Sequence, residues 1–303
     1  MGVIRMAWAD LLKISLYHGY IPQILLAEGF TVSGSDSKES ALTRELIADG
    51  AIVNYPQAAE NITDDIDVVV FTAAIHPDNV EYAAAVSKGI PMLTRAQLLG
   101  QIMDNYPQSI AISGTHGKTT TTSMISQILL CAEADPTISV GGILKAIGGN
   151  IRVGPSDTFV TEACEYTNSF WDFRPRYSLI LNIEEDHMDF FKDLADIRHS
   201  FRVFAENTKA GGTIILNRAI EAPEEITGGL DVNVLTYSID GQADYTAKDI
   251  SFDGHACASY TACYKGEPLY PVTLRVPGIH NVGNSLAVIA LMQTLGMEPS
   301  IVQ

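Results

Sequence analysis

The segment that most restricts the fold of this chain is a glycine-containing turn between an apolar run and a long helical pattern. Residues 113–120 read Ser-Gly-Thr-His-Gly-Lys-Thr-Thr, and the residues at 109–113 predict a strand. Apolar residues at 124, 125, 128, 129 and 132 share one face of a predicted helix over 118–132. A strand, a glycine turn and a helix in this order are typical of a phosphate-binding loop.

The residue types in this loop suit a nucleoside triphosphate. Glycines allow the backbone N–H groups to surround the phosphates, and the helix N-terminus adds partial positive charge. Lys118 supplies a cation for the β- and γ-phosphates, and the Thr119 hydroxyl is suited to bind Mg²⁺. The spacing departs from the usual G-x-x-x-x-G-K-[ST] because Ile112 stands at the first glycine position. The predicted ATP contacts are Gly114, Thr115, His116, Gly117, Lys118, Thr119 and Thr120.

Strand and helix patterns alternate along the chain, which predicts a parallel α/β fold with two domains. A linker near 106–107 divides residues 1–107 from residues 108–303. In the first domain we expect strands at 30–34 and 67–71 and helices at 40–49, 79–87 and 95–103. In the second we expect buried strands at 159–160 and 179–181, a helix capped by Asp193, short alternating strands within 231–276, and a helix at 281–295.

The charge balance excludes several classes of partner. The chain has 19 basic and 36 acidic residues in 303, a formal net charge of −17, which argues against nucleic acid and anionic membranes as partners. The four cysteines lack zinc-type spacing and read as reduced thiols. No apolar run reaches the roughly 18–20 residues of a membrane span, and we see no basic and apolar signal segment. We therefore expect a cytoplasmic protein. The sequence does not indicate its oligomeric state.

Three further segments, in order along the chain, carry recognisable motifs. Residues 161–170 read TEACEYTNSF, residues 181–189 read LNIEEDHMD, and residues 280–284 read HNVGN. Together with GTHGKTT, these segments resemble the Mur ligase superfamily, which also contains folylpolyglutamate synthases. The resemblance implies a Rossmann-like N-terminal domain that binds a UDP-sugar, followed by a central domain that binds ATP with Mg²⁺.

The resemblance also implies roles for individual residues. Thr119 and Glu162 are expected on the Mg²⁺ shared by the β- and γ-phosphates, and His187 on a second Mg²⁺ near the γ-phosphate and the acyl oxygen. Asn281 and Asn284 match the motif near the adenine. On this basis, the expected catalytic residues are Lys118, Glu162 and His187.

Several of these side chains have a simpler structural interpretation. A lone carboxylate such as Glu162 is often solvated, and Glu165 in the same segment is an alternative to it. A lone histidine such as His187 is more often structural than a metal ligand. Asn281 fits a helix cap, and Asn150 fits a turn as well as it fits a substrate contact.

The residues within these motifs most resemble one branch of the family. The members of this branch add L-alanine to UDP-N-acetylmuramate through an acyl phosphate in peptidoglycan synthesis. The segments at 32–36 and 72–79, VSGSD and TAAIHPDN, also resemble this branch and imply substrate contacts for Asp36, His76 and Asn79. The branch that joins a recycled tripeptide to the same nucleotide sugar is the nearest alternative. A nucleotide-binding remnant without ligase activity is a third interpretation.

Both ends of the chain depart from the family pattern. Residues 1–23 are atypical and lack the family's G-x-G-G-x-[GS]-M loop for the UDP diphosphate, so UDP binding does not follow from the resemblance. The chain ends at Gln303, just after the central domain. We therefore expect a truncated form, without the family's C-terminal domain and with little or no ligase turnover by itself.

Overall fold

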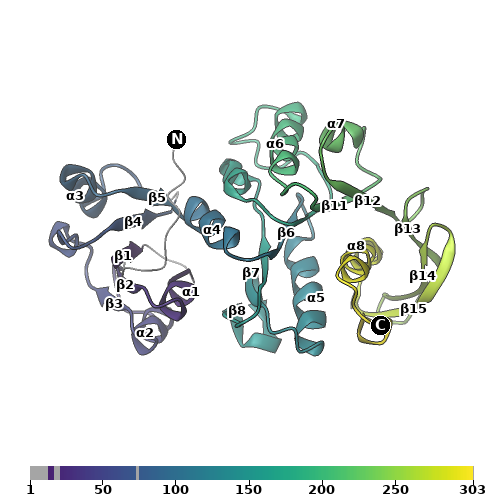
Figure 1. The fold of residues 1–303 in the computed structure, drawn as a ribbon, viewed down its shortest axis with the longest axis horizontal. Helices are drawn as coiled ribbons and strands as arrows, with labels where there is room; N and C mark the ends of the chain where they lie inside the picture. The colour runs from purple at the N-terminus through teal and green to yellow at the C-terminus, as the bar shows by residue number, and fades with distance from the viewer. Residues whose placement is uncertain (1–12, 17–20, 73–74, 303) are drawn as a thin grey trace. The chain divides into compact units, whose positions relative to one another are not determined.

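The structure is a computed structural model that describes residues 13–16, 21–72 and 75–302. It divides into two compact units, Met1–Leu99 and Gly100–Gln303, and both are of the predicted α/β class (Figure 1). The division falls inside helix α4 (Arg95–Asp104). The domain boundary expected at residue 107 stays a prediction. None of the helices in the described ranges is long and apolar enough to cross a membrane.

The N-terminal unit is built on a five-stranded sheet in the order β3-β2-β1-β4-β5. Its paired strands are all parallel, so their carboxyl ends lie at one edge. The strands are β1 (Lys13–Leu16), β2 (Thr31–Ser35), β3 (Ile52–Asn54), β4 (Val68–Phe71) and β5 (Met92–Thr94). The helical elements besides α4 are α1 (Ile21–Ala27), α2 (Ala41–Ala48), η1 (Ala59–Asn61) and α3 (Val80–Lys88).

Local capping explains where the helices of this unit begin. The Ser40 side chain accepts a hydrogen bond from the Thr43 backbone N–H at the start of α2. The Asn79 side chain accepts from the backbone N–H groups of Glu81 and Tyr82 at the start of α3. The predicted helices at 40–49 and 79–87 and the predicted strand at 67–71 are therefore confirmed within about a residue. The central strand β1 was not predicted.

The second unit is built on a ten-stranded mixed sheet in the order β15-β14-β13-β12-β11-β10-β6-β9-β7-β8. The strands β7, β9, β6, β10, β11, β12 and β13 are neighbours in this order, and each pair of neighbours among them is parallel. At the two ends of the sheet the pairs are antiparallel: β8 pairs with β7, β14 with β13, and β15 with β14. The strands are β6 (Gln108–Ser113), β7 (Thr137–Leu144), β8 (Gly149–Arg152), β9 (Thr158–Glu162), β10 (Tyr177–Ile180), β11 (Thr213–Asn217), β12 (Asn233–Ser238), β13 (Tyr245–Phe252), β14 (Cys257–Tyr264) and β15 (Glu267–Pro277).

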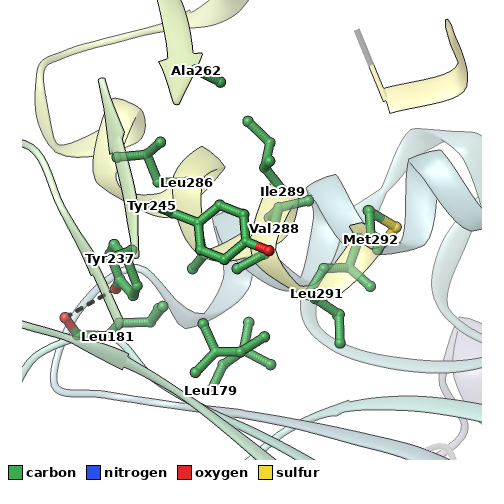
Figure 2. Packing of buried hydrophobic residues seen from close by; sticks show 14 of the residues in the cluster. Leu179, Leu181, Tyr237, Tyr245, Ala262, Leu286, Val288, Ile289, Leu291 and Met292 are labelled. Carbon is green, nitrogen blue, oxygen red and sulfur yellow. Dashed lines mark hydrogen bonds between the residues drawn. The ribbon is translucent and has the colours of Figure 1, made fainter. Parts of the chain in front are cut away.

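The main core of this unit lies between the sheet and two long helices, α5 (Lys118–Cys131) and α8 (His280–Thr294). Helix α8 is buried almost all round, and its side chains pack against Leu179, Tyr237 and Tyr245 of the sheet (Figure 2). The Tyr237 hydroxyl donates to the carbonyl oxygen of Leu181 at 3.3 Å, drawn as a dashed line in Figure 2. The helical elements are α5 (Lys118–Cys131), η2 (Lys145–Ile147), η3 (Tyr166–Asp172), α6 (Leu194–Glu206), α7 (Glu224–Thr227), α8 (His280–Thr294) and α9 (Pro299–Val302).

A second, aromatic core forms between α6 and η3. Phe170 stacks on Phe204 with ring centroids 4.8 Å apart, and it meets Phe201 edge to face at 5.3 Å. The Asp193 side chain caps α6 by accepting from the Asp196 backbone N–H. The predicted cap of this helix is confirmed, and its buried face contains Ile197, Phe201 and Phe204.

Candidate functional site

The loops of the predicted site meet because three parallel strands end side by side. In the sheet register, Ile112 of β6 lies opposite Glu162 of β9, and Ser113 lies opposite Ile180 of β10. The segments that follow these strands are 114–117, 163–165 and 181–189. The carboxyl edge of a parallel sheet is where α/β proteins place ligands, so the sheet brings the GTHGK, EACEY and LNIEEDHMD segments together there.

Close packing explains the two glycines of the loop. Gly114 has φ +140° and Gly117 has φ +88°, backbone angles that L side chains rarely adopt. A Cβ atom at Gly114 would lie 2.9 Å from Cβ of Leu181, and one at Gly117 would lie 2.9 Å from Oδ1 of Asn284. The loop therefore packs closely between Leu181, the residue after β10, and Asn284 of helix α8.

Asn182 holds the backbone of the loop in place. Its Oδ1 accepts from the His116 backbone N–H at 2.7 Å, and its Nδ2 donates to the His116 carbonyl at 3.0 Å. The Thr115 hydroxyl accepts from the Glu184 backbone N–H at 3.0 Å. The His116 ring is largely exposed, with Nε2 3.9 Å from a Glu184 carboxylate oxygen. These contacts give His116 a structural role in the turn, and its predicted contact with ATP stays a prediction. The contribution of Asn182 was not predicted.

Lys118, the first residue of α5, points back into the loop. Its Nζ donates to the carbonyl oxygens of Gly114 and Thr115. It also pairs with Glu165, at 3.0 Å to Oε1 and 2.9 Å to Oε2. The Lys118 side chain is 16% exposed and the Glu165 side chain 2% exposed, so the ion pair is largely shielded from water.

Glu162 and Thr119 converge on a glycine pair in β7. Glu162 ends β9, and its Oε1 accepts from the Gly141 backbone N–H at 2.6 Å. A Cβ atom at Gly141 would lie 2.8 Å from Oε2 of Glu162, and one at Gly142 would lie 3.2 Å from Cγ2 of Thr119. The structure therefore places the two residues expected on one Mg²⁺ beside consecutive positions of β7. The glycine pair at 141–142 was not predicted as part of the site. Glycines inside a strand often mark a place where another group approaches the backbone closely, so this pair was a signal that the sequence offered.

His187 lies beside the other glutamate of the EACEY segment. Its Nε2 is 3.8 Å from Oε1 of Glu165 and 3.9 Å from Oδ2 of Asp186. The Tyr166 ring lies 4.6 Å from the imidazole, centroid to centroid, with the planes 31° apart. His187 has φ +52°, an uncommon backbone conformation for this residue type that the surrounding contacts maintain. Glu165 thus contacts both Lys118 and His187.

Charges and burial also act on the neighbouring ionisable groups. Burial raises the pKa of the Cys164 thiol, as do the charges of Glu165 and Glu162, whereas the Tyr166 backbone N–H and Lys118 lower it. The hydrogen bond that Tyr166 donates to Asp189, 2.8 Å long, raises the pKa of the phenol.

Asn281 and Asn284 lie in the first turns of α8 next to the loop. Asn281 Nδ2 donates to the Pro277 carbonyl at 2.8 Å, and Asn284 Nδ2 donates to Oδ1 of Asn281 at 2.9 Å. The alternative in which Asn281 is a simple helix cap is wrong, because Asn281 lies inside the helix and Ile279 is the residue at the N-cap position. Asn284 contacts the loop through Gly117.

Asn150 lies in β8 and not in a turn. Its Oδ1 is buried and has no hydrogen-bond partner within the described part of the chain. An unpaired carbonyl oxygen of this kind costs free energy unless a ligand or water satisfies it. Its predicted contact with substrate stays a prediction.

Helix α5 also borders an apolar cavity of about 610 Å³ in the second unit, between α5, α8 and β15. Of the predicted site residues that the structure describes, Thr120 alone lines this cavity.

The predicted substrate residues of the first unit lie near the carboxyl ends of its strands. Asp36 follows β2 and accepts from the Ser37 backbone N–H at 2.6 Å. His76 is exposed and follows β4 by a few residues. Asn79 caps α3, and its Nδ2 donates to Gln57 Oε1 at 2.9 Å. Both the oxygen and the nitrogen of its side-chain amide therefore have hydrogen-bond partners within the protein. Residues 1–12, 17–20, 73 and 74, which include most of the atypical segment, lie outside the described residues.

The donors present fit a Mg²⁺ ion that arrives with a nucleotide. In the described ranges, no group of three or more His, Cys, Asp or Glu side chains is arranged to hold a metal ion. Mg²⁺ in nucleotide sites is usually held by one or two protein oxygens together with phosphate oxygens and water. The Thr119 hydroxyl and the Glu162 carboxylate are oxygen donors of this kind.

Comparison with known proteins agrees with the four sequence motifs. The profile of the Mur ligase middle domain matches residues 112–292, and that of the Mur ligase family, catalytic domain, matches residues 20–107. The chain belongs to the Mur ligase family. Its relatives among Mur ligases include the UDP-N-acetylmuramate–L-alanine ligases of Agathobacter rectalis, 63% identical over 278 residues, and Lachnospira eligens, 56% identical over 279 residues. Each alignment covers 92% of this chain and 61% of the relative.

Solved structures of Mur ligases share the same fold. UDP-N-acetylmuramate–alanine ligase from Thermotoga maritima matches with a TM-score of 0.80 and 28% identity, over 96% of this chain and 66% of that one. UDP-N-acetylmuramate:L-alanyl-γ-D-glutamyl-meso-diaminopimelate ligase from Neisseria meningitides matches with a TM-score of 0.83 and 26% identity, over 96% and 94% of the two chains. The chain thus spans about 61% of the length of the curated Mur ligases it matches.

Proposed function

We propose that this chain carries the nucleotide centre of a cytoplasmic ligase that adds L-alanine to UDP-N-acetylmuramate, with ATP and Mg²⁺. The observation that supports this most is the convergence of Lys118, Glu162 and His187 at one sheet edge in a chain 63% identical to such a ligase. The reaction occurs in two steps. The lactyl carboxylate attacks the γ-phosphorus and ADP leaves, and the amine of L-alanine then attacks the acyl carbon and inorganic phosphate leaves.

The difficulty of the first step is electrostatic, because a carboxylate must approach a triphosphate. Preorganised positive charge is therefore more useful than proton transfer. In the proposed complex, the backbone N–H groups of the loop and the Lys118 ammonium bind the β- and γ-phosphates. Thr119 and Glu162 would hold a Mg²⁺ ion, which would add positive charge beside the same phosphate oxygens. We assign His187 to a second Mg²⁺, which it would hold on the acyl side of the γ-phosphate; its position beside Glu165 supports this role.

Binding of the nucleotide sugar is assigned to the first unit. Asp36, His76 and Asn79 are the proposed contacts, supported by the position of Asp36 and His76 after the carboxyl ends of β2 and β4. These strands flank β1, where the strand order reverses, and such a point is where open α/β sheets bind nucleotides. Asn150 is the proposed substrate contact of the second unit, supported by its unpaired Oδ1.

The first half-reaction gives a test that does not depend on how the amine is bound. The chain is incubated with ATP, Mg²⁺, UDP-N-acetylmuramate and hydroxylamine, which converts an acyl phosphate into a hydroxamate and inorganic phosphate. We expect the UDP-N-acetylmuramate hydroxamate, detected by mass, and none from Lys118→Ala. UDP-N-acetylglucosamine, which has no lactyl carboxylate, is the matched control and should give none.

The same assay separates the alternatives. Replacing hydroxylamine by L-alanine, or by the tripeptide L-alanyl-γ-D-glutamyl-meso-diaminopimelate, shows which amine yields an amide product, with protein in excess over UDP-N-acetylmuramate because little turnover is expected. Neisseria meningitides provides a structural neighbour whose name contains this tripeptide, so the second amine is a fair competitor. Product with the tripeptide alone would favour the recycling reaction. Absence of hydroxamate from a chain that binds ATP would favour a nucleotide-binding remnant and contradict the proposal.

A further inference from the structure

The Lys118 ammonium donates hydrogen bonds to acceptors of its own chain. An ammonium has three N–H donors, and the acceptors around Nζ are two loop carbonyls and both carboxylate oxygens of Glu165. The cation that is expected to bind phosphate is therefore directed toward its own loop and a neighbouring anion. A phosphate can reach it only by displacing at least one of these acceptors.

The partner in this pair is unusual for a glutamate. Glu165 is 2% exposed, and burying a carboxylate is costly unless it is paired and hydrogen-bonded. It lies three residues after Glu162 and contacts Lys118 of α5 and His187 of the LNIEEDHMD segment. Its position joins the three loops at the sheet edge, although it is not the carboxylate placed beside Thr119.

We propose that Glu165 is a positioning residue that holds Lys118 in a retracted orientation until a polyphosphate displaces it. The inference deepens the proposed function, because it takes the loop to be a nucleotide site. In the absence of nucleotide, the Glu165 carboxylate neutralises the ammonium and keeps the loop closed on itself. When the triphosphate binds, its oxygens replace the carboxylate as acceptors, and Glu165 retains His187 as a neighbour.

This exchange of acceptors predicts opposite effects on stability and on affinity. Removing the charge of Glu165 weakens a buried ion pair, so the unliganded protein should lose stability. The same change frees Lys118 from its competitor and removes an anion from the path of the phosphates, so polyphosphate should bind more tightly. A purely structural role for Glu165 would lower stability and leave affinity unchanged or weaker.

The test uses the variant Glu165→Gln, which keeps the side-chain size and a carbonyl acceptor. Isothermal titration of ATP in excess EDTA, without Mg²⁺, measures the effect on the loop and its lysine. We expect binding about tenfold tighter than in the unmodified chain, the factor of one charge-assisted hydrogen bond, together with a lower melting temperature before ATP is added. Equal or weaker ATP binding by this variant overturns the inference.

Glu184→Gln is the matched control for removing one negative charge from the same edge. Its side chain is 62% exposed and lies near His116, not Lys118. We expect less than about a twofold change in ATP affinity, because exposed charges interact weakly. A gain equal to that of Glu165→Gln would mean that general charge, not the pair with Lys118, sets the affinity.

Lys118→Ala separates failure of the inference from failure of the proposed function. If Lys118→Ala leaves ATP binding unchanged, the nucleotide site itself is misplaced and both proposals fail. If Lys118→Ala weakens binding, the gain from Glu165→Gln should vanish in the double variant, as a thermodynamic cycle requires of a pair that acts together. If Glu165→Gln does not fold, Glu165→Asp decides by the same titration, with an intermediate gain expected and no gain contradicting the inference.

Discussion

At the scale of single residues, the site combines groups whose properties depend on charges only a few ångströms away. Cys164 lies between Glu162 and Glu165 in the chain, and burial of its thiol acts in the same direction as these two carboxylates, raising its pKa. Lys118 acts in the opposite direction. The reactivity of this thiol therefore depends first on its desolvation and then on the charges around it.

We predict that Cys164 reacts slowly with iodoacetamide at neutral pH. The thiolate is the reactive form, and a raised pKa shifts its formation to higher pH than the value of about 8.5 for a free thiol. Peptide mapping by mass spectrometry at several pH values measures the rate at this position. N-acetylcysteine serves as the reference. A midpoint at or below that of the reference would contradict the raised pKa of this thiol.

At the scale of elements, helix ends and strand ends place the site residues. Asn79 is an example in which capping and a predicted substrate contact compete for one side chain. Its Oδ1 accepts from two backbone N–H groups of α3, and its Nδ2 donates to Gln57. A contact between the Asn79 amide and the sugar nucleotide would therefore use the second N–H of Nδ2 or replace the hydrogen bond from Nδ2 to Gln57.

We predict that Asn79→Ala destabilises α3 by about 1 kcal/mol, the typical value of a lost N-cap. Hydrogen exchange in the backbone of α3 should become about fivefold faster. Asn79→Asp keeps the capping oxygen and should exchange like the unmodified chain. Titration of UDP-N-acetylmuramate into both variants then tests the substrate contact separately. A loss of affinity in Asn79→Asp, with unchanged exchange, would show that the amide binds the sugar nucleotide.

The sequence was sufficient for elements that have strong local signals. The caps at Ser40 and Asn79 and the continuous apolar run at 67–71 specify their elements directly. Strand β1 was missed because it is only four residues long, and its place at the sheet centre depends on pairing with β2 and β4. Such pairing joins residues distant in sequence.

The same limit applies to the site. Motifs identified Lys118, Glu162 and His187, and the structure brings their loops to one edge. The pairing of Lys118 with Glu165, the hydrogen bonds of Asn182 to the loop backbone and the approach of Glu162 to Gly141 were not predicted. These contacts join residues between 21 and 66 positions apart in the chain, and they depend on the strand order of the sheet.

At the scale of the whole molecule, the core of the second unit contains tyrosines whose pKa values burial raises above the usual range, among them Tyr237, Tyr245 and Tyr260. The folded state therefore retains these protons at a pH where the unfolded chain loses them. The stability that depends on them is complete below about pH 10, the value for an unfolded tyrosine, and is lost as the pH rises above it.

We predict that the free energy of unfolding of the second unit falls steeply above pH 10. Tyr237 is completely buried, so it alone should contribute about 1.4 kcal/mol per pH unit in this range. Urea unfolding of Trp8→Phe, whose sequence keeps Trp171 as its single tryptophan, followed by fluorescence at pH values between 8 and about 11, measures the slope. In Tyr237→Phe the slope should be smaller by this amount. An identical slope in the variant would contradict the burial of the phenol.

In the proposed function, the second unit binds a nucleoside triphosphate at the loop around Lys118. The most direct test is isothermal titration of ATP with Mg²⁺ into the chain and into Lys118→Ala. We predict one ATP per chain, with binding about 10- to 100-fold weaker in the variant, as expected for the loss of hydrogen bonds from a charged group. No ATP binding, or equal binding by both proteins, would contradict the account.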